Sequence, residues 1–404
     1  MTEPAAVEPL APGTRLLQVG PFKTGTTAIQ HVASARRELL AAHGVVYPGR
    51  GLNHRWGLAA LTGLTWGWAR TDATGAPPRH GSELLRELGA ASRHARLWLS
   101  YERLAVLDDD VATALCERIG GPVHVLVGLR PLRSLLPSEW QQLVKSGRRP
   151  GALDDWAGAA MDGIATGSSR FRHLDHLGLV DRWARVVGAG AVTCVVTDPA
   201  RPEETPQALE ALLGLPSGLL QPPTNLGGHR SNRSLTAAEV ALLAAVAREL
   251  RDRGATQADY QEVVGRGVVA RLLARRPSAT EARMGLGPRA AERARGIDQD
   301  VAGRLAGLGV HVRGDLAWYG GASSTGVEAG PRVADLPDSV PLEVAVAAVL
   351  GAAESALRVR NAGARVLARR LLRSVAVPRR VGRAGRPLRS GVAASAAGAG
   401  PASR

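Results

Sequence analysis

The stretch Leu16-Leu17-Gln18-Val19-Gly20-Pro21-Phe22-Lys23-Thr24-Gly25-Thr26-Thr27 carries the strongest structural signal in this chain. Its apolar start is typical of a short buried strand, and residues 28–42 carry apolar side chains close to helical spacing. A strand, a glycine-containing turn and a helix start form a phosphate cradle, because backbone N–H groups and the positive end of the helix point at the anion. Thr26 and Thr27 can add hydroxyl donors. We therefore predict an anion-binding turn at residues 20–27.

The position of Lys23 distinguishes this turn from the common ATP and GTP loops. Of the 51 basic side chains only Lys23 and Lys145 are lysines, and a compact ammonium fits a tight anion site better than a planar guanidinium. The ATP/GTP loop places its lysine directly after the second glycine, whereas Lys23 lies two residues before Gly25. The lysine therefore approaches the anion from the strand side. A strand-to-helix turn that binds nothing is the structural alternative.

The turn resembles the 5′-phosphosulfate loop of the sulfotransferases that use PAPS (3′-phosphoadenosine 5′-phosphosulfate), commonly P-K-[ST]-G-T-[ST]. Phe22 stands where that family usually has a proline. The resemblance implies sulfuryl transfer to a hydroxyl or amine without a metal, with Lys23 as the catalytic cation for charge that grows on the leaving phosphate. It also implies that the 5′ end of PAPS is bound by Phe22, Lys23, Thr24, Gly25, Thr26 and Thr27.

A second motif follows the predicted strand at residues 123–129. That strand ends in Arg130-Pro131, and Ser138 stands eight residues after Arg130. The sulfotransferase family places an arginine at a strand end and a serine at this spacing, so the resemblance implies that Arg130 and Ser138 bind the 3′-phosphate of PAPS. The chemistry fits, because an arginine offers two parallel N–H donors to phosphate oxygens. Taken alone, each of the two can be a solvated surface residue.

Two residues are candidates for the general base. Glu102 follows the predicted strand at residues 96–100 and resembles the Ser-x-Glu segment of many carbohydrate- and protein-type sulfotransferases. A carboxylate at the carboxyl end of a strand faces the crevice where open α/β sheets bind ligands. His54 resembles the histidine in a loop after the second strand of related bacterial sequences, and an imidazole titrates near neutral pH. We favour Glu102 slightly; the structural alternatives are an ion pair for Glu102 and a pocket-capping role for His54.

The order of predicted elements indicates an α/β fold with a central parallel sheet flanked by helices. The resemblance implies that this is the P-loop-like sulfotransferase fold. Strands alternate with helices and are predicted at residues 15–19, 45–47, 96–100, 123–129 and 192–197. Thr236 opens a capping box before a long helix, and residues 311–316 are predicted as a loop. The predicted segments are a flexible N-terminus at 1–11, the α/β domain at 12–320, a linker at 321–340 and an Ala/Arg-rich extension at 341–404, helical and then disordered.

The net charge of +15 is concentrated in the C-terminal extension. From Arg358 onward there are twelve arginines and no acidic residue, so the rest of the chain carries about +3. Specific nucleic-acid binding is therefore not expected. A weak contact of the tail with an anionic membrane surface is one interpretation of these charges, and a solvated tail is the other.

The cysteines, the N-terminus and the hydropathy of the chain indicate where in the cell the protein is expected. Cys116 and Cys194 have neither disulfide nor metal-ligand spacing, the N-terminus lacks a secretory signal, and no apolar stretch is long enough for a bilayer. We therefore expect a cytoplasmic protein without a metal. Trp56, Trp66 and Trp68 cluster in a chain poor in aromatics, and they can stack on a sugar or aromatic acceptor or pack in the core.

The acceptor remains open between a small molecule, a carbohydrate and a lipid, and the sequence does not specify the oligomeric state. Two other functions are compatible with the same residues. One is a P-loop nucleotide kinase or NTPase, which needs a lysine directly after the second glycine. The other is a non-catalytic protein of the same fold that binds a lipid surface or PAP (adenosine 3′,5′-bisphosphate).

Overall fold

The computed structural model describes residues 8–21, 25–66, 73–222, 233–321 and 331–375, and for residues 361–375 it describes the backbone only. The chain forms two units, Met1–Ser355 and Ala356–Arg404. Most of the expected flexible N-terminus and the expected disordered tail from residue 376 lie outside the described residues.

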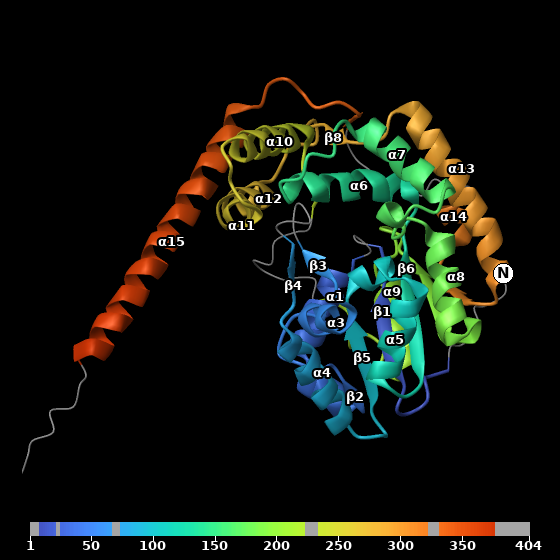
Figure 1. Cartoon of the computed structure of the whole chain (residues 1–404). Coiled ribbons are helices and arrows are strands. Elements are labelled where there is room, and N and C mark those ends of the chain that lie inside the picture. Colours follow the sequence, from blue (N-terminus) through green and yellow to red (C-terminus); the bar gives the residue numbers. More distant parts are fainter. Residues whose placement is uncertain (1–7, 22–24, 67–72, 223–232, 322–330, 376–404) are drawn as a thin grey trace, which may run out of the picture. The chain divides into compact units, whose positions relative to one another are not determined.

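A six-stranded parallel sheet forms the centre of the first unit (Figure 1). Neighbouring strands follow the order β2 (Val45–Val46), β5 (Arg96–Ser100), β1 (Arg15–Val19), β6 (Val123–Leu129), β7 (Val192–Val196) and β9 (His311–Arg313). Each neighbouring pair runs parallel, which confirms the predicted fold class. The predicted loop at residues 311–316 is wrong at its start, because His311–Arg313 pairs with β7 as an edge strand.

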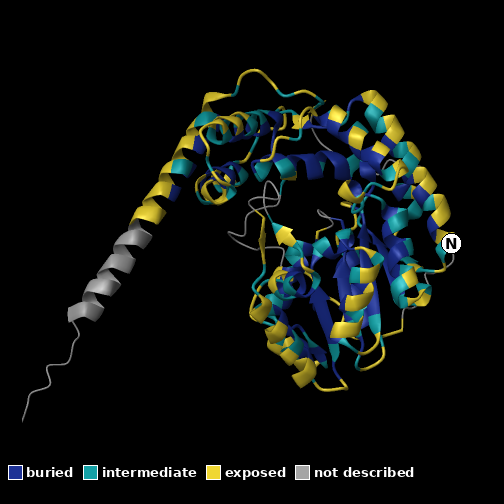
Figure 2. Ribbon diagram, viewed as in Figure 1, coloured by how far each residue is buried: buried dark blue, intermediate teal, exposed yellow. Residues whose placement is uncertain are grey.

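Helices cover both faces of the sheet, and the strands between them are buried (Figures 1 and 2). Leu16, Trp98 and Leu126 point to one face and share a core with the helices α1 (Thr26–Ala35), α2 (Arg37–Ala42) and α9 (Glu204–Leu213). Leu17 and Leu99 alternate to the other face. The helices that pack there are α3 (Arg55–Thr62), α4 (Pro78–Ala90), η2 (Glu102–Val106), α5 (Asp109–Ile119), α8 (His176–Val187), α13 (Pro288–Leu305) and α14 (Leu316–Tyr319).

A third hydrophobic core is formed by α6 (Leu132–Lys145), which follows β6, and by further helices outside the sheet. Its other elements are α7 (Leu153–Ala165), α10 (Ala237–Asp252), α11 (Gln257–Tyr260), the π-helix η5 (Gln261–Val269), α12 (Ala270–Ala274) and the start of α15 (Leu342–Val375). The predicted capping box is present, with Thr236 and Glu239 bonded reciprocally. Short elements complete the described part: η3 (Ser169–Phe171), η4 (Ala189–Ala191), η6 (Ala306–Leu308), and the pairs β3 (Thr65–Trp66) with β4 (Thr74–Gly75) and β8 (Arg283–Met284) with β10 (Arg332–Val333).

The start of α15 belongs to the first unit. Val344 and Ala347 are buried in the third core, and α15 crosses η5 so closely that a Cβ on Gly267 would lie 2.4 Å from the carbonyl oxygen of Gly351. The segment predicted as a linker contains β10, which pairs with β8. Among the described residues, no helix combines the length and hydropathy needed to cross a membrane.

Candidate functional site

The carboxyl ends of β5, β1 and β6 meet at one edge of the sheet. β1 lies between the other two strands, and its last residue, Val19, pairs with Val127 of β6. The chain leaves β1 at Gly20, Glu102 follows β5, and Arg130 directly follows β6. This edge of an open α/β sheet is where ligands bind. The two phosphate motifs predicted from the sequence therefore leave neighbouring strands on the same side of the sheet.

The turn after β1 ends at a left-handed glycine. Gly25 has a φ of 78° and immediately precedes α1, which begins at Thr26. Within the described residues, no side chain caps this helix start and a Cβ at Gly25 would meet no atom within 4 Å. The first N–H groups of the helix can therefore be satisfied by a ligand placed close to the backbone. Phe22, Lys23 and Thr24 lie outside the described residues.

Glu102 is held in place by two side chains of α1. Thr26 donates its hydroxyl hydrogen to Oε1 of Glu102, and Nε2 of Gln30 donates to the same oxygen at 3.1 Å. Gln30 is buried. Its Nε2 also donates to Oγ of Ser100 at 2.9 Å, and its Oε1 accepts a hydrogen bond from Nδ2 of Asn53 at 3.3 Å. In the described part of the chain Oε2 of Glu102 receives no hydrogen bond, so it is the oxygen that can accept a proton.

The hydrogen bond to Glu102 bears on the predicted role of Thr26 as a donor to a phosphate. A hydroxyl has one hydrogen, and that of Thr26 is used by Glu102. Thr26 therefore cannot also donate to a phosphate in this conformation. Thr27, half-buried in the same first turn of α1, has no such bond among the described residues and is the hydroxyl of the pair that is left to a phosphate.

His54 is bonded to backbone through both ring nitrogens. Its Nδ1 accepts the N–H of Ser100 at 2.9 Å, and its Nε2 donates to the carbonyl of Pro48 at 3.1 Å. Burial lowers the pKa of His54 to about 4. A neutral imidazole with both nitrogens bonded has no lone pair to offer a substrate. His54 therefore anchors the loop after β2 to the end of β5.

Arg130 lies among hydroxyl groups and other arginines. Its Nε donates to Oγ of Ser134 at 3.1 Å, and Ser138 stands four residues further along α6, on the same side of the helix. Burial lowers the pKa of Arg130, and the positive charge of Arg332 lowers it further. The pKa of Arg332 is itself lowered by burial and by Arg283. Clustered like charges of this kind are stabilised by an anion, and guanidinium groups match the geometry of phosphate.

Arg332 is a residue of this cluster that the sequence did not reveal. It lies on β10, inside the segment predicted as a linker, and the pairing of β10 with β8 brings it toward Arg130. Gly285, just after β8, leaves room for its stem, because a Cβ there would lie 3.0 Å from Cβ and 3.1 Å from Cδ of Arg332. No motif surrounds Arg332 in the sequence, so only the strand pairing could have found it.

A cavity of about 550 Å³ opens beside the Glu102 network, and we call it the Trp56 cavity. Asn53 and His54 line it together with Trp56, whose ring packs against Trp66 and His80 with centroids 5.1 and 5.9 Å away. The predicted grouping of Trp56 with Trp66 is therefore present, whereas Trp68 lies outside the described residues. The charged side chains of the lining, His80 aside, are Arg50, Glu83, Arg86 and Glu87.

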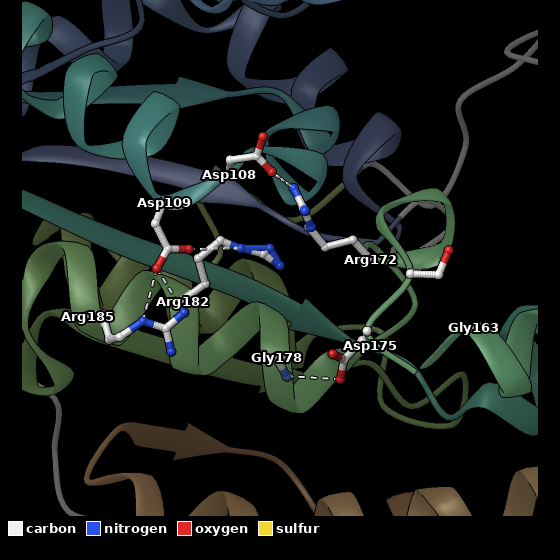
Figure 3. Close-up of a pocket in the computed structure, with 10 residues that line it drawn as sticks. Asp108, Asp109, Gly163, Arg172, Asp175, Gly178, Arg182 and Arg185 are labelled. Carbon is white, nitrogen blue, oxygen red and sulfur yellow. Dashed lines mark hydrogen bonds and ion pairs between the residues drawn. The ribbon is translucent and has the colours of Figure 1, made fainter. Parts of the chain in front are cut away.

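A second cavity, of about 350 Å³, lies where α5 and α8 begin, and we call it the Arg182 cavity (Figure 3). Its arginines and aspartates face one another. Arg172 contacts Asp108, Arg185 bonds Asp109 at 2.9 Å, and buried Arg182 lies 3.9 Å from Asp109. Because these charges already neutralise each other, we interpret the cavity as a structural clamp between the two helices. Among the described residues, no group of His, Cys, Asp or Glu side chains is placed to hold a metal ion.

Comparisons with known proteins give one similarity. No protein-family model matches the chain, and no curated protein matches it. Among solved structures, the crystal structure of a sulfotransferase from Alicyclobacillus acidocaldarius is similar over 57% of this chain and 91% of its own, with 15% identity and a TM-score of 0.34. At this level of similarity, only the geometry of the chain itself bears on its function.

Proposed function

We propose that this protein is a PAPS-dependent sulfotransferase that moves the sulfuryl group of PAPS to a hydroxyl or amine. The observation that carries the proposal is the register of β1 beside β6, since the turn at residues 20–25 and Arg130 leave the sheet from adjacent strand ends. A nucleotide with phosphates at both ends can reach both places. The position of Lys23, on the strand side of Gly25, separates this loop from those that bind ATP or GTP.

The residues at this edge suit such a nucleotide. The open backbone at Gly25 and the uncapped start of α1, among the described residues, favour the 5′ end, with the loop residues Phe22, Lys23, Thr24 and Thr27 as further contacts. Arg130 and Arg332 suit the 3′-phosphate because both carry positive charge and Arg332 is near enough to lower the pKa of Arg130. Ser138 adds a hydroxyl donor from α6.

The proposed chemistry assigns one task to each side chain. Bound PAPS supplies a sulfuryl group whose bond to the phosphate oxygen breaks as the acceptor atom bonds to sulfur. Lys23 stabilises the charge that develops on the leaving phosphate. Glu102 accepts the proton of the acceptor on Oε2, while Thr26 and Gln30 fix its orientation through Oε1. His54 acts as a positioning residue that holds the loop after β2.

Thermal unfolding with nucleotides tests the proposal. PAP at a hundredfold excess over its Kd should stabilise the protein by roughly 2.7 kcal/mol, and ATP with Mg²⁺ should stabilise it less. Arg130→Ala should reduce the PAP shift without changing the Tm of the free protein strongly. No shift with PAP, or a larger shift with ATP and Mg²⁺, would overturn the proposal and favour a nucleotide kinase or NTPase.

The variant Lys23→Ala tests catalysis and nucleotide binding separately. Lys23→Ala should lower turnover far more than PAP affinity, because the ammonium acts mainly as the bond to the leaving phosphate breaks. Turnover is measured with PAPS and PAP affinity by calorimetry. An equal loss of both would make Lys23 a binding residue, and an unchanged turnover would favour a non-catalytic protein of the same fold.

A further inference from the structure

The Trp56 cavity is connected to the candidate base. Asn53 lines the cavity, donates to Gln30 at 3.3 Å, and Gln30 donates to Glu102 at 3.1 Å. The cavity therefore lies two hydrogen bonds from the carboxylate that the proposed reaction uses. Its volume of about 550 Å³ is within the range of cavities that hold small ligands.

One side of this cavity is aromatic. Trp56 is 44% exposed although it is a large apolar side chain. Trp66 and His80 contact its ring, and the guanidinium of Arg55 lies 4.8 Å from its centroid. These neighbours hold the indole in place, so little side-chain freedom is lost when a ligand packs on it. A fixed, exposed indole of this kind suits a ligand with a flat apolar face.

The remaining lining offers charges of both signs. In the described part of the chain neither Arg50 nor Arg86 forms an ion pair, whereas Glu83 lies 3.3 Å from His80 and Glu87 accepts the N–H of Gly49. A guanidinium only donates hydrogen bonds and a carboxylate only accepts them. Hydroxyl groups do both, so a polyhydroxylated ligand satisfies the arginines and the glutamates together.

Other ligand classes fit this lining less well. An anionic ligand that pairs with Arg50 or Arg86 would also face Glu83 and Glu87, whose charges repel it. A simple phenol would cover Trp56 but would desolvate the charged groups without bonding them, which is costly. A neutral ring with hydroxyls around its edge and C–H groups on its faces meets both requirements.

We propose that the Trp56 cavity binds a neutral carbohydrate, which serves as the acceptor. This inference rests on the proposed sulfotransferase function. The sugar ring packs on Trp56, its hydroxyls bond the charged lining, and one hydroxyl reaches Glu102. In the transfer, the O–H proton passes to Glu102, the sugar oxygen bonds to sulfur, and the sulfur–oxygen bond to the phosphate breaks to release PAP.

A printed array of neutral and acidic glycans tests the sugar site, with the labelled full chain saturated with PAP as the probe. Neutral glycans should capture the protein, and Trp56→Ala should weaken capture at least tenfold. Trp56→Phe, which keeps an aromatic platform, should recover part of it. The matched control is Ser168→Ala in the Arg182 cavity, which should leave capture unchanged. Capture by acidic glycans alone, no capture, or capture that Trp56→Ala leaves intact would overturn the inference.

A PAP thermal shift measured on the same samples separates the two proposals. If PAP stabilises the wild type and Trp56→Ala equally but no neutral glycan captures the protein, the carbohydrate inference is wrong and the proposed transfer stands. If neutral glycans capture the protein and PAP gives no shift, the sugar site stands and the transfer is wrong. Sulfation of 2-naphthol from PAPS, with no neutral sugar sulfated, would also overturn the carbohydrate acceptor.

Discussion

The Trp56 cavity and the Arg182 cavity are both lined by charged side chains, but they use the charges differently. In the Arg182 cavity, Arg172, Arg182 and Arg185 each face an aspartate (Figure 3). In the Trp56 cavity, Arg50 and Arg86 form no ion pair among the described residues, and a tryptophan stays exposed. The number of charges in a cavity therefore does not identify a binding site. What distinguishes one is whether those charges already satisfy each other.

Burial explains why the Arg182 cavity needs its pairing. Burial lowers the pKa of Arg182 to about 10, and the nearby charge of Arg172 adds to this, while Asp109 and Asp175 oppose it. A buried guanidinium is stable only with such partners. The aspartates that pair with it also stand at or near the starts of α5 and α8, where negative charge stabilises a helix. The cluster thus joins two helix starts and has little left for a ligand.

The largest expected effect is a loss of turnover when Glu102 is replaced, and Asp109 of the Arg182 cavity provides the comparison. Glu102→Gln removes the proposed base and keeps a similar shape, so turnover with PAPS should fall by roughly 100- to 10,000-fold, while PAP affinity stays within about threefold because the residue is not assigned to the nucleotide. Asp109→Asn, in the Arg182 cavity, is the matched control and should lower the Tm but leave turnover near the wild-type value. Equal turnover in Glu102→Gln and the wild type would remove Glu102 from the mechanism.

The next largest effect is the pH dependence of stability, to which His54 in the Trp56 cavity should contribute and Arg182 should not. The pKa of His54 is about 4 in the folded chain and 6.5 in the unfolded one, so between these values the unfolded chain binds a proton that native His54 does not. The stabilising contribution is fully present above pH 6.5 and decreases as the pH falls to 4, by about 3 kcal/mol in all. Arg182 stays charged throughout this range, since its pKa is about 10.

Urea unfolding at pH 7 and pH 4 measures this difference. His54→Gln should lose the pH-dependent part, whereas His43→Gln, at an exposed histidine, should keep it. The low pKa values of His124 and His176, about 4 and about 3, act in the same direction, and the raised pKa of Asp298, about 7, acts in the opposite direction. These groups are common to all three proteins and cancel in the comparison. An identical pH dependence in His54→Gln and the wild type would contradict the prediction.

A smaller effect, on PAP affinity, is expected for Arg332, near Arg130, and none for an arginine of the Arg182 cavity. Arg332→Ala should weaken PAP binding about tenfold, because a charge-assisted hydrogen bond contributes about 1.5–3 kcal/mol and Arg332 is exposed, which places it at the lower end of that range. Arg185→Ala removes a comparable positive charge from the Arg182 cavity and should leave PAP affinity unchanged. Calorimetric titration with PAP measures both. A similar loss in the two variants would mean that overall charge, and no specific contact, governs binding.

The smallest effect is expected at Arg86. This side chain lines the Trp56 cavity without an ion pair among the described residues, so Arg86→Met should change the free energy of unfolding by no more than about 0.5 kcal/mol. The same variant should weaken capture by neutral glycans. Unfolding in urea and binding to the glycan array provide the two measurements. A large loss of stability would show that Arg86 is structural, as the arginines of the Arg182 cavity are.

The outcome at His54 shows where residue types alone were insufficient. An imidazole titrates near neutral pH, and the resemblance to related bacterial sequences made His54 a candidate base. The structure bonds both ring nitrogens to backbone groups of Ser100 and Pro48, which lie far apart in the sequence. The contact with Ser100, 46 residues from His54, cannot be inferred from the residues around His54. The same holds for Gln30, whose contact with Glu102 joins α1 to the end of β5.

Local patterns alone determined the central strands and several ends of elements. β1, β5 and β6 have the predicted bounds because each is a mainly apolar run bounded by turn residues. The capping box at Thr236 depends only on residues a few positions away. The parallel sheet followed from the alternation of these strands with helices. The sequence also indicated which strand ends carry Glu102 and Arg130.

Only the tertiary structure decided the features that need partners distant in the chain. β9 exists because His311–Arg313 meets the edge of β7, and Arg332 reaches the arginine cluster because β10 pairs with β8. The Arg182 cavity pairs its charges between α5 and α8, whereas the Trp56 cavity leaves Arg50 and Arg86 without an ion pair among the described residues and keeps a tryptophan exposed. A sequence specifies local conformation through each residue and its neighbours, whereas burial and charge pairing depend on where the folded chain brings distant residues together.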